Sequence, residues 1–544
     1  MRPTFDPQNL ISVDRSYTYI PYKDTGYFSH LVTDYLDNNE QARAFVTYAP
    51  SAEGLSKAIA DRTQYPVDRK ALVSVLNKQY AGLTKYDKVD ANIALLSEEN
   101  TFTICTAHQP NLLTGYLYFI YKILHAIKLA EELTTLHPGK NFVPVYYMGS
   151  EDNDIEELGT FRYEGEKYVW DGDGQTGAVG RMRTEGLKPL LHKLFKFFGP
   201  PGTNCDELTT MLTTAYLGHK TIAEATQYLV HELFGRYGLI VINPDEAELK
   251  ASFIPVMKDE LLHQEAYPII SRQIEKLSAH YKIQANPRLI NLFYLTDHVR
   301  ERIERKGDQW VALNTATKWN EAELLAELNE HLERFSPNVM LRGLYQETIL
   351  PNVAFIGGGA EVAYWLQLNT LFEHYNVFYP VILLRQSALW IGDTQAKLRK
   401  QLSLSTTEIF KQEVQIVRDY ISANSTDAWQ TEGETKAIEA IFTGLKQKAT
   451  SLDPTLRSAA EAALAKMRHQ LITLEKKMLR AEKKKMQTQL LKIERLKKGL
   501  FPRNSLQERV ENFTEYYLKY GAAYLDILKD GMLPLANNNF MVVE

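Results

Sequence analysis

Polar residues interrupt an otherwise apolar stretch of the sequence where a strand is expected to give way to a helix. The stretch FTICTAHQPNLLTGYLYFIYK, residues 102–122, begins with β-rich residues and ends with the spacing of a helix. Between them stand His108, Gln109, Pro110 and Asn111. Imidazole and amide groups beside a helix N-terminus suit a phosphate or a carboxylate. A polar loop that merely caps the helix is the alternative interpretation.

An acidic segment follows the next apolar run. Residues 143–149, VPVYYMG, lead directly into Glu151, Asp152 and Asp154. Three carboxylates at one edge of a sheet are costly unless a cation neutralises them. The candidates are a substrate ammonium group, a magnesium ion or a protein base such as Lys122, and Asp152 or Asp154 could act as general base toward an amine. A solvated acidic loop is the alternative.

A glycine-rich turn, NVAFIGGGAEVAYW, supplies a third candidate site. Gly357, Gly358 and Gly359 would let backbone N–H groups approach an anion, and Glu361 follows on the expected helix. No Lys-Ser/Thr pair follows the glycines, so the turn is not a P-loop. The next strand ends in Arg385 and Ser387, and arginine suits a carboxylate or phosphate.

Other motifs are excluded. GDGQTG, residues 172–177, matches the dinucleotide fingerprint, but no helix follows it, so NAD is not expected. Cys105 and Cys205 are the only cysteines of the 544 residues, which excludes a disulfide framework and a structural zinc site. The net charge of −5 gives no overall attraction to nucleic acid, and no apolar stretch is long enough to span a membrane. We therefore expect a soluble, cytoplasmic protein.

Alternating strand and helix patterns predict the elements that position these residues. Residues 101–106 and 142–149 read as strands, and residues 116–136 between them read as a helix, which makes a βαβ unit. Similar units follow at 228–246 and 352–385. We therefore predict an α/β fold with a Rossmann-like parallel-sheet core, a helical lead-in up to about residue 98, and insertions at 163–183 and 291–310.

Beyond about residue 390 the strand pattern is replaced by long charged helices. We predict a core domain over 1–390 and an α-helical coiled-coil domain over 391–544, with a seam helix at about 452–499. The apolar seam comprises Leu456, Ala460, Ala463, Met467, Leu471, Leu474, Met478 and Ala481. Its partner is expected to be residues 393–421 or the last helix, which Ser505 and Glu508 would open as a capping box.

Taken together, the motifs resemble the bacillithiol biosynthesis cysteine-adding enzymes. The resemblance rests on long stretches in the same order along the chain: TAHQPNLLTGYLYFIYKILHAIKLAEEL, PVYYMGSEDNDIEEL, INLFYL, FSPNVMLRGLYQETILPNVAFIGGGAEVAYWLQL and LFPRNSLQERVENFTEYYLKYG. It implies a ligase that carries out the last step of bacillithiol synthesis, joining cysteine through an amide to glucosaminyl malate. It also implies a homodimer that forms through the coiled-coil domain.

The implied reaction gives the candidate residues expected roles. His108, Gln109, Asn111 and the Gly357–Gly359 turn would face phosphate if ATP, with Mg²⁺, activates the cysteine carboxylate. Asp152 and Asp154 would hold an ammonium group or deprotonate the sugar amine. The remaining candidate substrate-binding residues are Glu151, Glu361, Arg385 and Ser387, with Arg385 assigned to a malate carboxylate. A nucleotidyl-transfer enzyme that activates another acid and a non-catalytic coiled-coil scaffold remain as alternatives.

Overall fold

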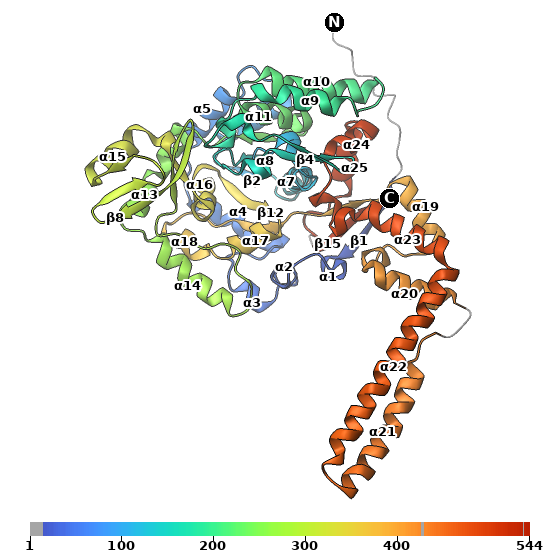
Figure 1. Cartoon of the computed structure of the whole chain (residues 1–544). Helices are drawn as coiled ribbons and strands as arrows, with labels where there is room; N and C mark the ends of the chain where they lie inside the picture. Colours follow the sequence, from blue (N-terminus) through green and yellow to red (C-terminus); the bar gives the residue numbers. More distant parts are fainter. Residues whose placement is uncertain (1–14, 426–428, 537) are drawn as a thin grey trace. The chain divides into compact units, whose positions relative to one another are not determined.

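The computed structural model describes residues 15–425, 429–536 and 538–544, and the chain forms two compact units (Figure 1). The first unit contains the chain up to Trp390 together with Ser505–Glu544, and the second contains Ile391–Asn504. The second unit therefore ends before the expected limit of residue 544. Residues 505–544 belong to the first unit, because their strand pairs with two strands of that unit.

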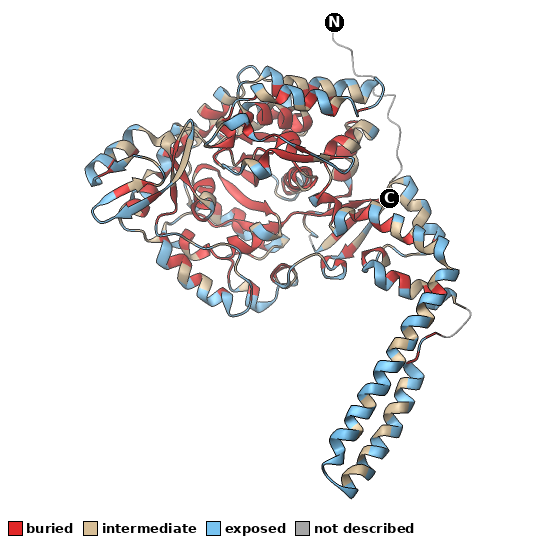
Figure 2. Ribbon diagram, in the orientation of Figure 1, coloured by how far each residue is buried: buried red, intermediate tan, exposed pale blue. Residues whose placement is uncertain are grey.

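A five-stranded parallel sheet forms the centre of the first unit and confirms the predicted Rossmann-like core. Its strand order is β13-β12-β2-β3-β6. The strands are β2 (Thr101–His108), β3 (Asn141–Met148), β6 (Ile240–Ile242), β12 (Asn352–Gly357) and β13 (Val381–Leu384). Most of their residues are buried, as expected for a sheet covered on both faces (Figure 2).

Strand register brings the candidate loops to one edge of this sheet. His108 lies opposite Met148 at the ends of β2 and β3, so the loops that follow these strands are neighbours. Gly357 lies opposite Leu384, which places the glycine turn beside Arg385. The carboxyl ends of parallel strands are where α/β proteins bind their ligands.

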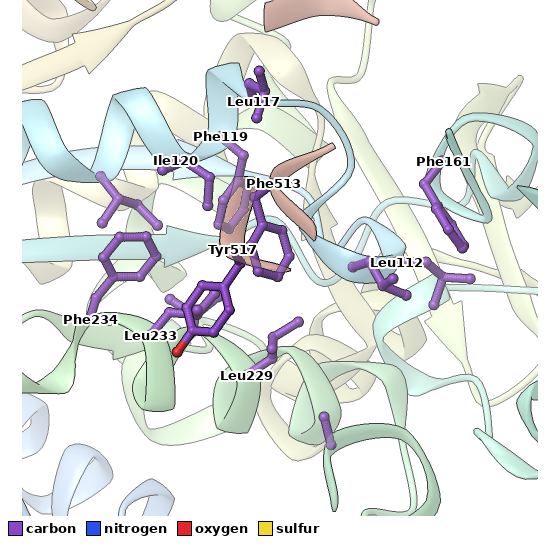
Figure 3. Close-up of a cluster of buried hydrophobic side chains, with 14 of the residues drawn as sticks. Leu112, Leu117, Phe119, Ile120, Phe161, Leu229, Leu233, Phe234, Phe513 and Tyr517 are labelled. Carbon is purple, nitrogen blue, oxygen red and sulfur yellow. The ribbon is translucent and has the colours of Figure 1, made fainter. Parts of the chain in front are cut away.

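Helices cover the sheet. Those that contact its strands are α4 (Ala52–Asp61), α6 (Asp87–Leu95), α7 (Tyr118–Leu136), α11 (Ile222–Phe234) and α17 (Gly359–Trp365). The first unit also contains α5 (Arg69–Gln79), α16 (Val339–Ile349) and α18 (Asn369–His374). One hydrophobic cluster joins α7 and α11 to α10 (Thr203–Gly218), α24 (Phe513–Tyr520) and α25 (Ala523–Gly531). Figure 3 shows Phe119 of α7 and Phe513 of α24 in this cluster, close to Leu229 and Leu233. The end of the chain is therefore part of the core.

Three further sheets complete the described part of the first unit. The antiparallel sheet β10-β9-β8-β7-β11 begins in the predicted insertion at 291–310 but extends beyond it to Pro337, and the hairpin β4-β5 overlaps the start of the insertion predicted at 163–183. Their strands are β4 (Thr160–Tyr163), β5 (Glu166–Val169), β7 (Leu292–Thr296), β8 (Val299–Lys306), β9 (Gln309–Ala312), β10 (Lys318–Trp319) and β11 (Phe335–Pro337). The third sheet pairs β1 (Tyr17–Pro21), β15 (Asn539–Val543) and β14 (Ala388–Trp390). It joins both ends of the described chain and was not predicted.

Shorter helices connect these parts of the first unit. They are α1 (Tyr22–Thr25), α2 (His30–Leu36), α3 (Glu40–Arg43), α8 (Ile155–Leu158), α9 (Lys188–Phe195), α12 (Ala247–Lys250), α13 (Ile254–Leu262), α14 (Ala266–Ser278) and α15 (Glu321–Glu330). Among the residues that the structure describes, no helix combines the length and apolar character needed to cross a membrane.

The second unit is helical and contains α19 (Asp393–Gln401), α20 (Glu413–Asn424), α21 (Glu432–Leu452), α22 (Leu456–Lys485) and α23 (Gln487–Leu500). The seam helix is thus divided at Met486 into α22 and α23. Its partner along α22 is α21, which forms a helical hairpin with it, whereas α19 and α20 pack against α23. The first expected partner, residues 393–421, is therefore correct only for the end of the seam.

The expected capping box at Ser505 and Glu508 is wrong. The last helical region begins at Phe513 with Asn512 as its N-cap, and Asn512 accepts a hydrogen bond from the N–H of Thr514. Glu508 lies instead in a short 3₁₀ turn, Gln507–Arg509, and is fully buried. The Glu508 carboxylate forms an ion pair with Arg385, which is distant in the sequence, and does not cap a helix as the local spacing predicted.

Candidate active site

A cavity of about 520 Å³ opens beyond the carboxyl ends of β2, β3 and β12. Eight of the candidate residues line it: His108, Gln109, Glu151, Asp152, Gly358, Gly359, Glu361 and Arg385. Asn111, Asp154, Gly357 and Ser387 do not line it. The parallel sheet therefore brings most of the predicted residues together from four separate parts of the sequence, the segments at the carboxyl ends of β2, β3, β12 and β13.

His108 is held at the end of β2 with its ring inside the cavity wall. Its carbonyl oxygen accepts hydrogen bonds from Gly149 N–H at 2.8 Å and from the Tyr146 hydroxyl at 3.0 Å. The imidazole packs against the rings of Tyr118 and Phe119. Its Nε2 atom is buried and has no hydrogen-bond partner among the described residues. A buried nitrogen of this kind is ready to bind a polar ligand.

The electrostatic surroundings keep His108 uncharged. Burial lowers its pKa well below the usual value, and the positive charges of Lys122, Arg385 and Arg342 lower it further. The ring is therefore neutral at physiological pH. A neutral imidazole surrounded by cations can donate one hydrogen bond to an anionic oxygen without adding a charge of its own.

The loop after His108 has an unusual backbone. Leu113 and Thr114 have φ values of +49° and +61°, which side chains with a Cβ rarely adopt, and Gly115 continues at +67°. Asn512 fixes this conformation, since its Nδ2 donates to the carbonyls of Leu113 at 2.8 Å and Gly115 at 2.5 Å. Asn111 is buried beneath Gly115, so it shapes the loop instead of facing the cavity.

The glycine turn binds a carboxylate of the protein itself. Gly358 N–H donates to Oε2 of Glu361 at 2.8 Å, and Lys122 forms an ion pair with the same oxygen. Because this N–H is already used, the expected role of the turn as a phosphate cradle is not supported. Lys122, a candidate neutraliser of the acidic segment, is instead the partner of Glu361.

In the acidic segment each carboxylate has a different environment. Glu151 pairs with the buried Lys250 at 2.5 Å and accepts a hydrogen bond from Ser336 at 3.0 Å. Asp152 accepts a hydrogen bond from Gln109 at 3.1 Å and lines the cavity. Asp154 caps α8 by accepting the N–H of Glu157 at 3.2 Å, so its predicted catalytic role is not supported.

Lys250 balances this acidic end of the sheet. It also contacts Asp245 at 3.0 Å, and Asp245 in turn pairs with Arg181 at 2.7 Å. Burial would lower the pKa of Lys250, but Glu151 and Asp245 outweigh it and raise that pKa. The neutralising cation of Glu151 is therefore part of the protein.

Arg385 is also neutralised internally. Its guanidinium donates to both oxygens of Glu508, at 2.9 and 2.7 Å, and to the hydroxyl of Ser387 at 3.0 Å. Ser387 donates to Glu508 as well, at 3.1 Å. Arg385 borders the cavity, but its charge is already paired with Glu508 and is not free for the malate carboxylate that we expected it to bind. Ser387 forms hydrogen bonds with both members of this pair.

Sequence reasoning missed several residues of the cavity. They are Tyr116, Tyr118, Tyr147, Glu157, Arg300, Asn338, Arg342 and Arg509. Arg300 comes from a strand of the inserted sheet and Arg342 from the first turn of α16, and neither position carries a local motif. Among the described residues, no group of three or more His, Cys, Asp or Glu side chains could hold a metal ion.

This architecture defines a Rossmann-like α/β protein whose cavity lies at the carboxyl edge of the parallel sheet, with an additional unit built on a helical hairpin. Two family models match the chain: "Bacillithiol biosynthesis BshC, N-terminal Rossmann-like domain" over residues 16–386, and "Bacillithiol biosynthesis BshC, C-terminal coiled-coil domain" over residues 388–544. The chain belongs to this family, as its sequence motifs predicted.

Individual relatives agree with the family models along nearly the whole chain. A Flavobacterium johnsoniae protein named "Putative cysteine ligase BshC" is 40% identical over 95% of this chain and 98% of its own length. A protein of the same name from Flavobacterium psychrophilum is also 40% identical, over 95% of this chain and 97% of its own length. A Bacillus cereus relative is 26% identical over 91% of this chain and 94% of its own length.

Proposed function

We propose that this protein is a cysteine ligase that completes bacillithiol synthesis by joining cysteine to the amino group of glucosaminyl malate. The observation that carries the proposal is the membership of the whole chain, core and helical unit alike, in the BshC family. The cavity supports it, because its lining contains both carboxylates that suit an amine and cations that suit carboxylates.

The reaction forms a bond between the carboxyl carbon of cysteine and the amino nitrogen of the sugar. One oxygen leaves the carboxyl carbon together with the phosphoryl or adenylyl group that activated it, and the nitrogen loses a proton. Amide formation from a free carboxylate is uphill in water, so the leaving oxygen must first be activated. We propose ATP with Mg²⁺ as the activating pair, although the Gly357–Gly359 turn does not suit a phosphate because Glu361 accepts the Gly358 N–H.

The cavity offers two carboxylates for the amine. Oε2 of Glu361 is held by Lys122 and Gly358, which leaves Oε1 as the atom that can accept the proton of the nucleophile. Asp152 is oriented by Gln109 and would bind the ammonium form before the proton is removed. His108 would donate a hydrogen bond from Nε2 to the carboxyl oxygen that becomes negatively charged.

Thiol analysis of a strain that lacks the gene tests this function. Such a strain should accumulate glucosaminyl malate and lack bacillithiol, and the wild-type gene should reverse both changes. His108→Ala, expressed equally, should fail, because loss of one such donor costs on the order of a hundredfold in rate. His137→Ala is the matched control, since His137 lies at the opposite end of α7.

The possible results separate the alternatives. Normal bacillithiol in the deletion strain would exclude the cysteine ligase assignment and favour a nucleotidyl-transfer enzyme for another acid or a scaffold. Full rescue by His108→Ala would retain the ligase but remove His108 from its catalytic groups. Purified protein incubated with cysteine, glucosaminyl malate, ATP and Mg²⁺, with each omitted in turn, would identify the activating pair by mass spectrometry.

A further inference from the structure

The charged residues of the cavity wall divide into those with an internal partner and those without one. Lys122 pairs with Glu361, and Arg385 pairs with Glu508. Three other arginines of the wall, Arg300, Arg342 and Arg509, have no carboxylate within 4.0 Å among the described residues. These are the cations that a bound anion could neutralise.

Arg342 is the best placed of the three. Arg300 donates to Asn153 at 3.0 Å, stacks on Phe293 and lies within the field of Asp152 and Glu151. Glu361, the carboxylate that acts on Arg342, is already paired with Lys122. Arg509 is exposed. Arg342 is half-buried on α16, and its guanidinium lies 5.7 Å from the centre of the Tyr147 ring. This low-exposure position strengthens its interaction with an anion.

Neutral donors accompany this guanidinium. Arg342 donates to the Tyr364 hydroxyl at 2.5 Å and to Gln346 at 3.2 Å. Its remaining N–H groups donate to no other residue in the described part of the chain. Burial raises the pKa of Tyr364, so the hydroxyl keeps its proton and can donate it to a ligand. The charge of Arg342 also acts on His108, whose buried Nε2 has no partner among the described residues.

We propose that Arg342 and the Tyr364 hydroxyl form a carboxylate subsite that binds the malyl group of the amine substrate, beside the His108 imidazole that serves the reacting carboxyl group. This assignment rests on the proposed ligase function and replaces Arg385 as the carboxylate-binding arginine. An arginine fork matches the two oxygens of a carboxylate. The N–H of Gly358, which a phosphate would need at the neighbouring turn, is already used by Glu361.

The chemistry of the reaction favours the malyl group over cysteine as the occupant. The cysteine carboxyl group loses its charge when it is activated, so a fixed cation bound to it would oppose that step. The malyl carboxylates keep their charge throughout the reaction. A cation that binds them equally before and during the reaction lowers KM and leaves kcat unchanged.

Titration calorimetry on the full-length protein tests the subsite directly, with L-malate, glucosaminyl malate, L-cysteine and inorganic phosphate as probes. Arg342→Gln should weaken binding of L-malate and glucosaminyl malate by about tenfold to a hundredfold, the usual effect of losing a charged hydrogen bond. It should leave L-cysteine binding within twofold. Arg302→Gln removes the same charge from an exposed position on β8 and should change neither affinity by more than twofold.

Two further variants test the carboxylate subsite if Arg342→Gln does not fold. Arg342→Lys keeps the charge but loses the fork, and Tyr364→Phe loses only the hydroxyl. Each should weaken L-malate binding less than Arg342→Gln, and each should raise KM for glucosaminyl malate with kcat nearly unchanged. An unchanged KM in both variants would overturn the subsite, as would a selective loss of L-cysteine or phosphate binding.

The outcomes also separate this inference from the proposed function. If wild-type protein forms bacillithiol and all Arg342 variants match it, the function stands and the subsite is wrong. If wild-type protein binds L-malate through Arg342 but forms no bacillithiol, the carboxylate subsite stands and the ligase assignment is wrong.

Discussion

Arg385 and Glu508 form a buried two-pronged ion pair, although 123 positions separate them in the sequence. Arg385 follows the edge strand β13 and borders the cavity, whereas Glu508 lies in the segment where the chain re-enters the first unit. Ser387 bonds to both side chains. The final segment of the chain thus completes one wall of the candidate active site.

We expect Glu508→Ala to destabilise the first unit by about 3–5 kcal/mol, because it leaves the Arg385 guanidinium buried without its counter-charge. Urea unfolding followed by tryptophan fluorescence measures this loss. Glu432→Ala is the matched control, since Glu432 pairs with Lys436 on the exposed surface of α21. That pair should contribute little to stability, because water and salt screen two fully exposed charges. Equal effects of the two substitutions would contradict the importance of the buried pair.

The first unit should fold when the helical unit is replaced by a short Gly-Ser linker between Trp390 and Ser505. Gln507 accepts the N–H of Trp390 at 2.9 Å and donates to its carbonyl at 3.0 Å, so the two chain ends already lie close together. Size-exclusion chromatography and thermal melting should show a compact, cooperatively folded protein. Truncation after residue 390 should instead aggregate, because it removes β15 from between β1 and β14. A soluble, folded 1–390 fragment would contradict this boundary.

Local sequence patterns were enough to predict which residues lie at the carboxyl edge of the parallel sheet. The residues that they missed are placed by contacts between distant parts of the chain. The apolar strands and the turns after them are encoded by neighbouring residues, so His108, Asp152 and Gly358 could be placed at one edge before the fold was known. The spacing of Ser505 and Glu508 also fits a helix cap, but Arg385 provides a stronger partner for the buried carboxylate. Lys250 and Arg342 enter the site only through tertiary packing, which no single-sequence motif encodes.

Asp152 and Asp154 should respond differently to the same isosteric change. Asp152→Asn should abolish bacillithiol formation, because it removes a carboxylate that lines the cavity. Asp154→Asn should retain activity and cost less than about 1 kcal/mol, since Asn also serves as an N-cap for α8. Complementation of the deletion strain and thermal melting measure the two effects. Loss of activity in Asp154→Asn alone would reverse these assignments.

A buried carboxyl group should make stability depend on pH. Burial raises the pKa of Glu347 from 4.5 to about 7, and its Oε1 accepts hydrogen bonds from Gln346 and Asn352. The folded protein therefore binds this proton more tightly than the unfolded chain, so the Glu347 contribution to stability falls as pH rises from about 4.5 to 7. Glu347→Gln should remove this decrease in the free energy of unfolding, which amounts to at most about 3 kcal/mol. Urea unfolding at pH 5 and 7.5 checks this. A variant with the wild-type pH profile would contradict the shift.

The hairpin of α21 and α22 should mediate homodimer formation. Ion pairs link the two helices, including Arg468 with Glu439, but no residue of α21 is buried and Figure 2 shows the hairpin largely exposed. Met467 and Leu474 of the seam remain 42% and 49% exposed, and a second copy of the chain would cover such an apolar stripe. Light scattering at micromolar concentration should give the mass of a dimer. The double substitution Met467→Glu and Leu474→Glu should give a monomer. Lys476→Glu should leave the dimer intact, because Lys476 is exposed on the opposite face of α22 from Met467. A monomeric wild-type protein would refute this mode of assembly, and a dimer that survives the double substitution would place the interface elsewhere.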